Sequence, residues 1–105
     1  MRNYELGLVL QPTLDETEVT RLIERIGQQL SADGGGVTSV NIWGKRPLAY
    51  PIRKQREGIY VFLQAQIDPR KVEQLERSLK LDENVLRHLL VYVETQVRMQ
   101  SVTRS

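Results

Sequence analysis

Residues 3–30 read NYELGLVLQPTLDETEVTRLIERIGQQL, and the spacing of apolar side chains changes within this stretch. Leu6, Leu8 and Leu10 occupy every second position, which is the period of a strand with one buried face. Pro12 ends that pattern. We therefore expect a strand over residues 3–11, followed at once by an element of another kind.

That next element is predicted to be a helix. Thr13 and Glu16 have the spacing of a capping box, and three glycines follow Asp33, where positive φ angles would end the helix and reverse the chain. Between these signals the apolar residues recur at helical intervals, which indicates one face packed on a flat surface. These residues are Val19, Leu22, Ile23, Ile26 and Leu30.

The rest of the chain predicts two strands, a second helix and a final strand. Residues 37–43 are rich in β-branched and aromatic side chains and predict a strand that extends toward Tyr50, and residues 59–67 predict a third strand. Asp68 and Pro69 are a strong helix start, with a buried stripe of Val72, Leu75 and Leu79. A final strand is expected over residues 85–93.

The order β-α-β-β-α-β predicts an α+β fold, the ferredoxin-like sandwich, in which a four-stranded antiparallel sheet carries both helices on one face. Right-handed crossovers place the first and third strands in the middle. The open face of the sheet is then a natural surface for a partner. We expect one domain over residues 1–94 and a flexible tail over residues 95–105. The apolar residues of that tail, Val97, Met99 and Val102, are expected to become buried only on assembly.

Composition excludes several classes of protein. The 105 residues suffice for one domain and contain no cysteine, so disulfides, thiolate nucleophiles and zinc knuckles are excluded. The single histidine, His88, is expected to be structural, and we expect neither a metal nor a cofactor. No apolar run approaches the roughly 18 residues of a membrane span, and no signal-peptide pattern opens the chain.

Charge is concentrated in one segment. The chain has a net charge of only +2, yet residues 43–57 contain five cations and only Glu57 as an anion. Aromatic residues and two prolines alternate with these cations, so the segment suits phosphates and unpaired bases. The alternative is an edge-strand extension that prolines and charges protect against aggregation.

A second feature is Gly58-Ile59-Tyr60-Val61-Phe62, which partly resembles the strand octapeptide of RNA-recognition motifs. Glu57 and Ile59 depart from that pattern. Tyr60 and Phe62 share one strand face, and either base stacking or core packing explains them.

Neither a nucleophile with a base nor a pocketed carboxylate pair is evident, so we expect no catalytic residues and no enzyme. An acylphosphatase-like hydrolase would need an arginine in the loop after the first strand, and residues 11–14 contain none. The alternative function is a small-molecule-binding regulatory module of ferredoxin-like fold that dimerises through its open sheet.

Four segments together resemble ribosomal protein six of the bacterial small subunit: MRNYE at residues 1–5, GKRPLAYPI at 44–52, EGIY at 57–60 and NVLRH at 84–88. The resemblance runs from Met1 to about Val93, and the order Leu-Ala-Tyr-Pro-Ile is its most specific part. It implies a structural constituent of the small ribosomal subunit, in a bacterial cytoplasm or a plastid.

The resemblance also implies partners and binding residues. Members of this family bind the central domain of 16S rRNA together with ribosomal protein eighteen of the small subunit, and we expect the isolated protein to be a monomer without membrane contact. The residues that the resemblance and the charge pattern assign to RNA contact are Arg2, Tyr4, Lys45, Arg46, Tyr50, Arg53, Lys54, Arg56 and Arg87. Tyr4 has a structural alternative, because it continues the face of Leu6, Leu8 and Leu10.

Overall fold

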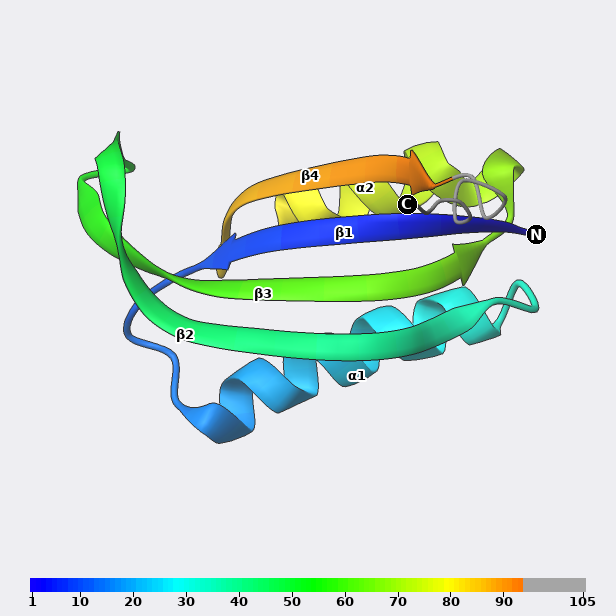
Figure 1. The fold of residues 1–105 in the computed structure, drawn as a ribbon, viewed down its shortest axis with the longest axis horizontal. Helices are drawn as coiled ribbons and strands as arrows, with labels where there is room; N and C mark the ends of the chain where they lie inside the picture. The colour runs from blue at the N-terminus through cyan, green and yellow to red at the C-terminus, as the bar shows by residue number, and fades with distance from the viewer. Residues whose placement is uncertain (94–105) are drawn as a thin grey trace, which may run out of the picture.

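A computed structural model describes residues 1–93, which form a four-stranded antiparallel sheet with strand order β2-β3-β1-β4. Figure 1 shows both helices on the same side of this sheet. The ferredoxin-like expectation is confirmed, including the central places of β1 and β3. The elements are β1 (Arg2–Leu10), α1 (Glu16–Ser31), β2 (Gly36–Ile52), β3 (Gln55–Ile67), a 3-10 turn (Pro69–Lys71), α2 (Val72–Leu81) and β4 (Val85–Val93). The tail expected over residues 95–105 lies outside the described residues.

The core lies between the sheet and the helices. Every second residue of β1 from Tyr4 to Leu10 is buried, and the register places each beside a buried residue of β3, such as Leu8 beside Val61. The helices cover these residues with the stripes that their period predicts. From α1 these are Val19, Leu22, Ile26 and Leu30, and from α2 they are Leu75 and Leu79.

The start of α1 corrects the sequence expectation. Asp15, rather than Thr13, is the N-cap, and its carboxylate accepts the N–H of Glu18 at 2.8 Å. Glu18 accepts the Asp15 N–H in return at 3.0 Å, which completes the capping box. Thr13 does not cap the helix because it lies in a turn that precedes it. In this turn the Leu14 N–H donates to Gln11 O.

Glycine ends α1 as expected. Gly34 has φ +88° and its N–H donates to Ser31 O, while the Gly35 N–H donates to Leu30 O at 2.9 Å. Gly35 is needed for a second reason, because a Cβ there would collide with the carbonyl oxygen of Gln66 on β3. The chain can therefore turn back tightly into β2.

Asp68 begins the 3-10 turn that precedes α2. Its carboxylate accepts hydrogen bonds from the backbone N–H and the guanidinium of Arg70. The Arg70 side chain and then its backbone N–H lower the pKa of Asp68 from 3.8 to about 2. Pro69 follows at the first helical position, where no N–H is needed.

Candidate nucleic-acid interface

The β2–β3 hairpin extends beyond the rest of the sheet. Strand β2 runs to Ile52, two residues beyond the expected extension toward Tyr50. Strand β3 starts at Gln55, four residues before the expected start at residue 59. Residues 44–58 form this projection, which we call the arm. Figure 1 shows the arm curving past the end of β1 toward the level of β4. Strand β2 can contain Pro47 and Pro51 because it is an edge strand, where an N–H on the outer side needs no partner strand.

The turn of the arm has an unusual backbone. Ile52 pairs with Gln55 across two residues, Arg53 with φ +50° and Lys54 with φ +67°. Two-residue hairpin turns with two positive φ angles ordinarily contain asparagine, aspartate or glycine. Here both positions carry cations, which places two charged side chains at the tip.

The candidate cations have no acidic partners. Within residues 1–93, no carboxylate lies within 4 Å of the nitrogens of Arg2, Lys45, Arg46, Arg53, Lys54, Arg56 or Arg87. Other exposed cations do have partners: Arg25 with Asp82, Arg70 with Asp68, Lys71 with Asp33 and Arg77 with Glu73. Arg21 and Lys80 also have no carboxylate within 4 Å among residues 1–93. The charges of the expected residues thus remain available to an anionic partner, and their concentration on and beside the arm distinguishes them from these two.

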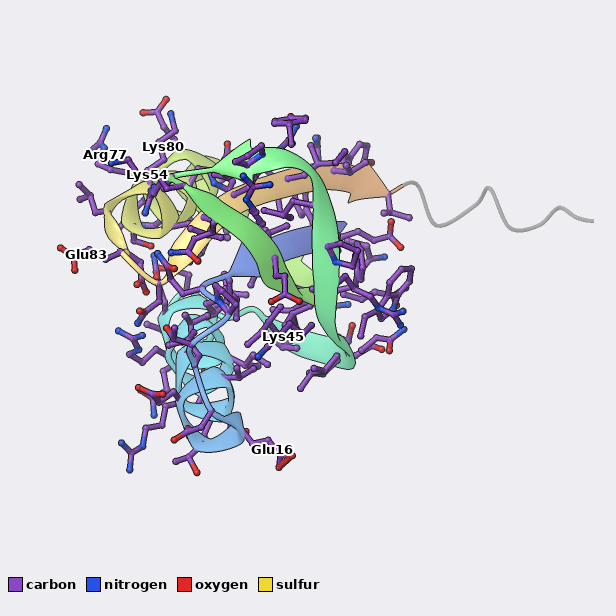
Figure 2. All side chains as sticks on the ribbon, turned by 90° about the vertical axis from the view of Figure 1, so that its left-hand side faces the viewer. Glu16, Lys45, Lys54, Arg77, Lys80 and Glu83 are labelled. Atoms are coloured by element: carbon purple, nitrogen blue, oxygen red, sulfur yellow. The ribbon has the colours of Figure 1, made fainter. Side chains whose placement is uncertain are left out.

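Two contacts join the arm to the body of the domain. The guanidinium of Arg87 on β4 donates to the Tyr50 hydroxyl at 2.8 Å, and that of Arg53 donates to Glu83 O at 3.3 Å. Figure 2 shows the tip residue Lys54 on the side of α2, in the direction of Lys80. The tertiary structure thereby brings Arg87, distant in sequence, to the arm.

Lys45 and Arg46 lie on opposite faces of β2. Arg46 pairs with Gly58 and its guanidinium lies 5.9 Å from the Trp43 ring centroid on the face without helices. Lys45 pairs with the core residue Ile59 and borders a pocket beside α1. One RNA strand running along the arm would therefore meet these two cations from different sides.

Arg2 and Tyr4 lie at the other end of the sheet. Arg2 pairs with Ile67, and its guanidinium lies 5.3 Å from the Tyr92 ring centroid. Tyr4 is only 9% exposed and belongs to the core, as its structural alternative predicts. Because β1 spans about 27 Å at roughly 3.4 Å per residue, the structure divides the expected RNA-binding residues into two separate groups.

The helix-free face carries an apolar surface, which we call the sheet patch. Phe62 points to this face and Tyr60 shares it, since the alternating residues Ile59, Val61 and Leu63 are the buried ones. Core packing therefore does not explain this aromatic pair. The exposed members of the patch are Trp43, Phe62, Leu89 and Val91. The sequence analysis did not identify Leu89 and Val91 as part of an exposed surface. Residues 85–93 have apolar side chains on both faces of the strand, and this pattern could have indicated such a surface.

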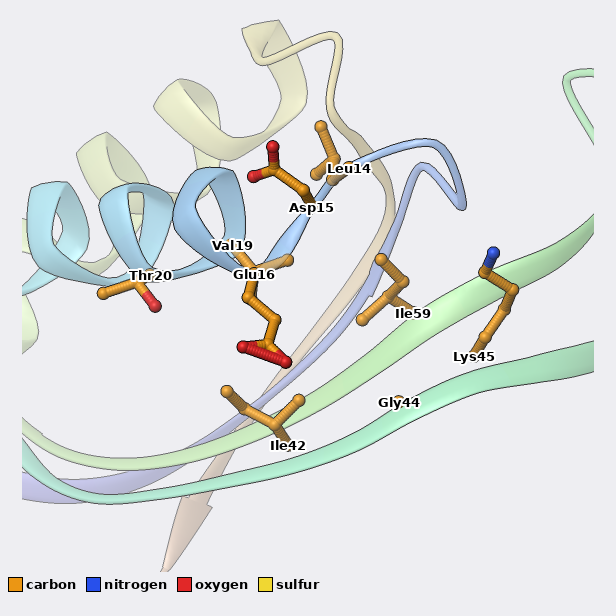
Figure 3. A pocket seen from close by; sticks show the side chains of 9 residues that line it. All are labelled: Leu14, Asp15, Glu16, Val19, Thr20, Ile42, Gly44, Lys45 and Ile59. Atoms are coloured by element: carbon orange, nitrogen blue, oxygen red, sulfur yellow. The ribbon is translucent and has the colours of Figure 1, made fainter.

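A pocket of about 430 Å³ lies between the start of α1 and β2. Figure 3 shows both apolar and polar side chains around it, with the carboxylate of Glu16 beside Ile42 and with Lys45 farther along β2. Asp15 is committed to capping the helix. The described residues contain no group of three or more potential metal ligands. The pocket therefore offers a small molecule few convergent polar groups.

His88 has a structural place. Its Nε2 lies 3.2 Å from a carboxylate oxygen of Glu76, and its side chain is 13% exposed, so it joins β4 to α2.

No helix among residues 1–93 has the length and apolar character needed to cross a membrane.

Comparisons with known proteins agree over nearly the whole chain. The family model described as Ribosomal protein S6 matches residues 3–92. The small ribosomal subunit protein bS6 of Saccharopolyspora erythraea is 48% identical over 83% of this chain and 74% of its own. That of Moorella thermoacetica is 40% identical over 90% of this chain and 96% of its own.

Two solved structures have the same fold, and one of them is a member of the same family. The crystal structure of 30S ribosomal protein S6 from Thermotoga maritima aligns with a TM-score of 0.79 and 26% identity, covering 88% of this chain and 87% of that one. The C-terminal domain of MgtC from Mycobacterium tuberculosis shares the fold alone, with a TM-score of 0.62, 15% identity and 90% of each chain covered. The chain thus belongs to the ribosomal protein S6 family, whose members are structural and not enzymatic.

Proposed function

We propose that this protein is a structural constituent of the small ribosomal subunit in the cytoplasm, and that it binds the central domain of 16S rRNA together with ribosomal protein eighteen. Membership of the S6 family supports the ribosomal role. Two surfaces of the domain support the two partners, because one offers unpaired cations and the other offers exposed apolar side chains.

The observation that carries the RNA assignment is the set of unpaired cations on and beside the arm. Arg46, Lys54 and Arg56 are exposed and have no carboxylate within 4 Å among residues 1–93. Cations of this kind neutralise phosphates and release counterions. Arg2 lies too far along β1 to join the same contact, so we assign it to a second stretch of RNA.

The sheet patch is assigned to ribosomal protein eighteen. Exposed apolar side chains that gather on one face are typical of protein interaction sites. The patch combines two aromatic rings with two aliphatic side chains, which suits the desolvated centre of a protein interface. A net charge of only +2 makes strong RNA binding by the free protein unfavourable, so a partner that adds surface should raise the affinity.

The test is a titration of a central-domain rRNA fragment at several salt concentrations, with this protein alone and then with ribosomal protein eighteen. We expect tighter binding by the pair. Lys54→Ala and Arg46→Ala should each reduce the slope of log affinity against log salt by about one or slightly less. Arg21→Ala removes an exposed charge on α1 outside the arm and should leave the slope unchanged. Equal affinities with and without ribosomal protein eighteen, or unaltered slopes in both arm variants, would overturn the assignment.

A further inference from the structure

The arm is held in one position by contacts that a free hairpin lacks. A two-stranded hairpin is at best marginally stable in water by itself. The pairing of β2 with β3 also becomes irregular between Pro47 and Ile52. The hydrogen bond from Arg87 connects Tyr50, in this irregular part, to β4. The hydrogen bond from Arg53 to Glu83 O connects the turn of the arm to the turn before β4.

Apolar packing closes the base of the arm. Gly58 is buried, and a Cβ at this position would collide with Cγ1 of Val9 on β1 and would lie 3.7 Å from Cδ2 of Leu48. Leu48 of β2 is half-buried. The base is thus fixed by close packing, and the two hydrogen bonds fix the part beyond it.

The tip adopts a backbone conformation that disfavours its own residues. Arg53 and Lys54 both have positive φ angles, which cost free energy for any residue with a side chain. Arg53 uses its side chain for the contact with Glu83 O, whereas Lys54 forms no ion pair with any of residues 1–93. The two neighbouring cations therefore have different roles available to them.

We infer that Tyr50, Arg53 and Arg87 are positioning residues that hold the arm, while Arg46, Lys54 and Arg56 are the residues that contact phosphate. This inference rests on the proposed function and deepens it. An arm already held in its binding position loses less conformational freedom when RNA binds. Loss of the positioning contacts lowers the fraction of binding-competent protein and hence the apparent affinity.

Phosphate contact and positioning differ in their dependence on salt. A contacting cation contributes to the salt slope, whereas a positioning residue changes affinity at every salt concentration by the same factor. Tyr50→Phe is the sharpest variant because it deletes only the hydroxyl and removes no charge. Tyr92→Phe is its matched control, at the opposite end of the sheet beside Arg2.

The experiment measures binding of the rRNA fragment by the pair with ribosomal protein eighteen, together with amide hydrogen exchange in the free protein. Tyr50→Phe should weaken binding about two- to tenfold, the effect of one net hydrogen bond. Its salt slope should equal that of the wild type, and exchange in residues 47–57 should accelerate. Arg53→Ala should also weaken binding without reducing the slope, and Tyr92→Phe should change neither quantity.

The outcomes separate the inference from the function on which it rests. The positioning role would be overturned if Tyr50→Phe had the RNA affinity and the amide hydrogen exchange of the wild type. It would also be overturned if Arg53→Ala lowered the salt slope of RNA binding by about one. A wild-type pair that fails to bind the rRNA in a salt-dependent way would overturn the proposed function and this inference together. Thermal unfolding shows that each variant is folded at the temperature of the measurement.

Discussion

Phe62 lies against Gly7, its partner on the neighbouring strand, so closely that a Cβ added to Gly7 would be 3.3 Å from Cε1 of the ring. The absence of a side chain on β1 thus lets this ring lie low on the helix-free face. Trp43 packs beside it at 4.7 Å between ring centroids, with the ring planes inclined by 54°. The sheet patch therefore has a preformed aromatic centre.

Removal of that centre should weaken the protein interface. Phe62→Ala removes a ring that is 39% exposed, so the free energy of unfolding should fall by only about 1–2 kcal/mol. The affinity for ribosomal protein eighteen should fall at least tenfold, as for the central aromatic residue of an interface. Isothermal titration calorimetry measures this loss. The control is Leu81→Ala, which removes a residue that is 78% exposed outside the sheet patch and should bind ribosomal protein eighteen with wild-type affinity. Equal affinities of the two variants for that protein would contradict the assignment of the sheet patch.

A substitution in the core should affect stability without affecting the salt dependence of RNA binding. Leu8 is 1% exposed between β3 and β4, so Leu8→Ala should lower the free energy of unfolding by about 2–5 kcal/mol through lost burial and a cavity. For a domain of this size each kcal/mol corresponds to about 4–8 °C in Tm. Urea unfolding and thermal melts measure the loss, and the folded fraction should keep the wild-type salt slope. A change below about 1 kcal/mol would show that this position is not tightly packed.

The arm turn should show opposing effects on stability and binding. Lys54→Gly removes the cost of a positive φ at a side-chain-bearing residue and should raise the free energy of unfolding by up to about 1 kcal/mol. The same change deletes a candidate phosphate contact, so the salt slope of RNA binding should fall. Gln55→Gly, at the next position but within β3, should instead destabilise by about 0.5–1 kcal/mol. Lower stability in Lys54→Gly would argue against backbone strain at the tip.

Stability should fall in strong acid through Asp68. Its pKa is about 2 in the folded protein against the ordinary 3.8, so the ionised carboxylate stabilises the fold at neutral pH. That contribution is complete above about pH 4 and is lost as the pH falls toward 2. Asp68→Asn should therefore be less stable than the wild type at pH 7, and the difference should shrink between pH 4 and pH 2. Chemical unfolding at a series of pH values tests this, and a constant difference across that window would be the contrary result.

The local elements followed from the sequence because their signals are local. The alternation in β1, the helical stripe from Val19 to Leu30 and the pair Asp68-Pro69 each act within a few residues of the backbone they determine. With the order of the elements and right-handed crossovers, these signals were sufficient for the ferredoxin-like topology. The cations of the arm were also identifiable, since their concentration in residues 43–57 is a property of composition.

Only the tertiary structure decided how those residues combine. Whether Tyr60 and Phe62 face the core or the helix-free side of the sheet depends on the register with β1, because a shift of one residue reverses the face. The contacts of Tyr50 with Arg87 and of Arg53 with Glu83 O span 37 and 30 residues, and they depend on the bend of the arm. The choice of Asp15 over Thr13 as the cap depended on the turn after Gln11. Local periodicity thus determined the elements, whereas register, twist and long-range packing determined which side chains meet.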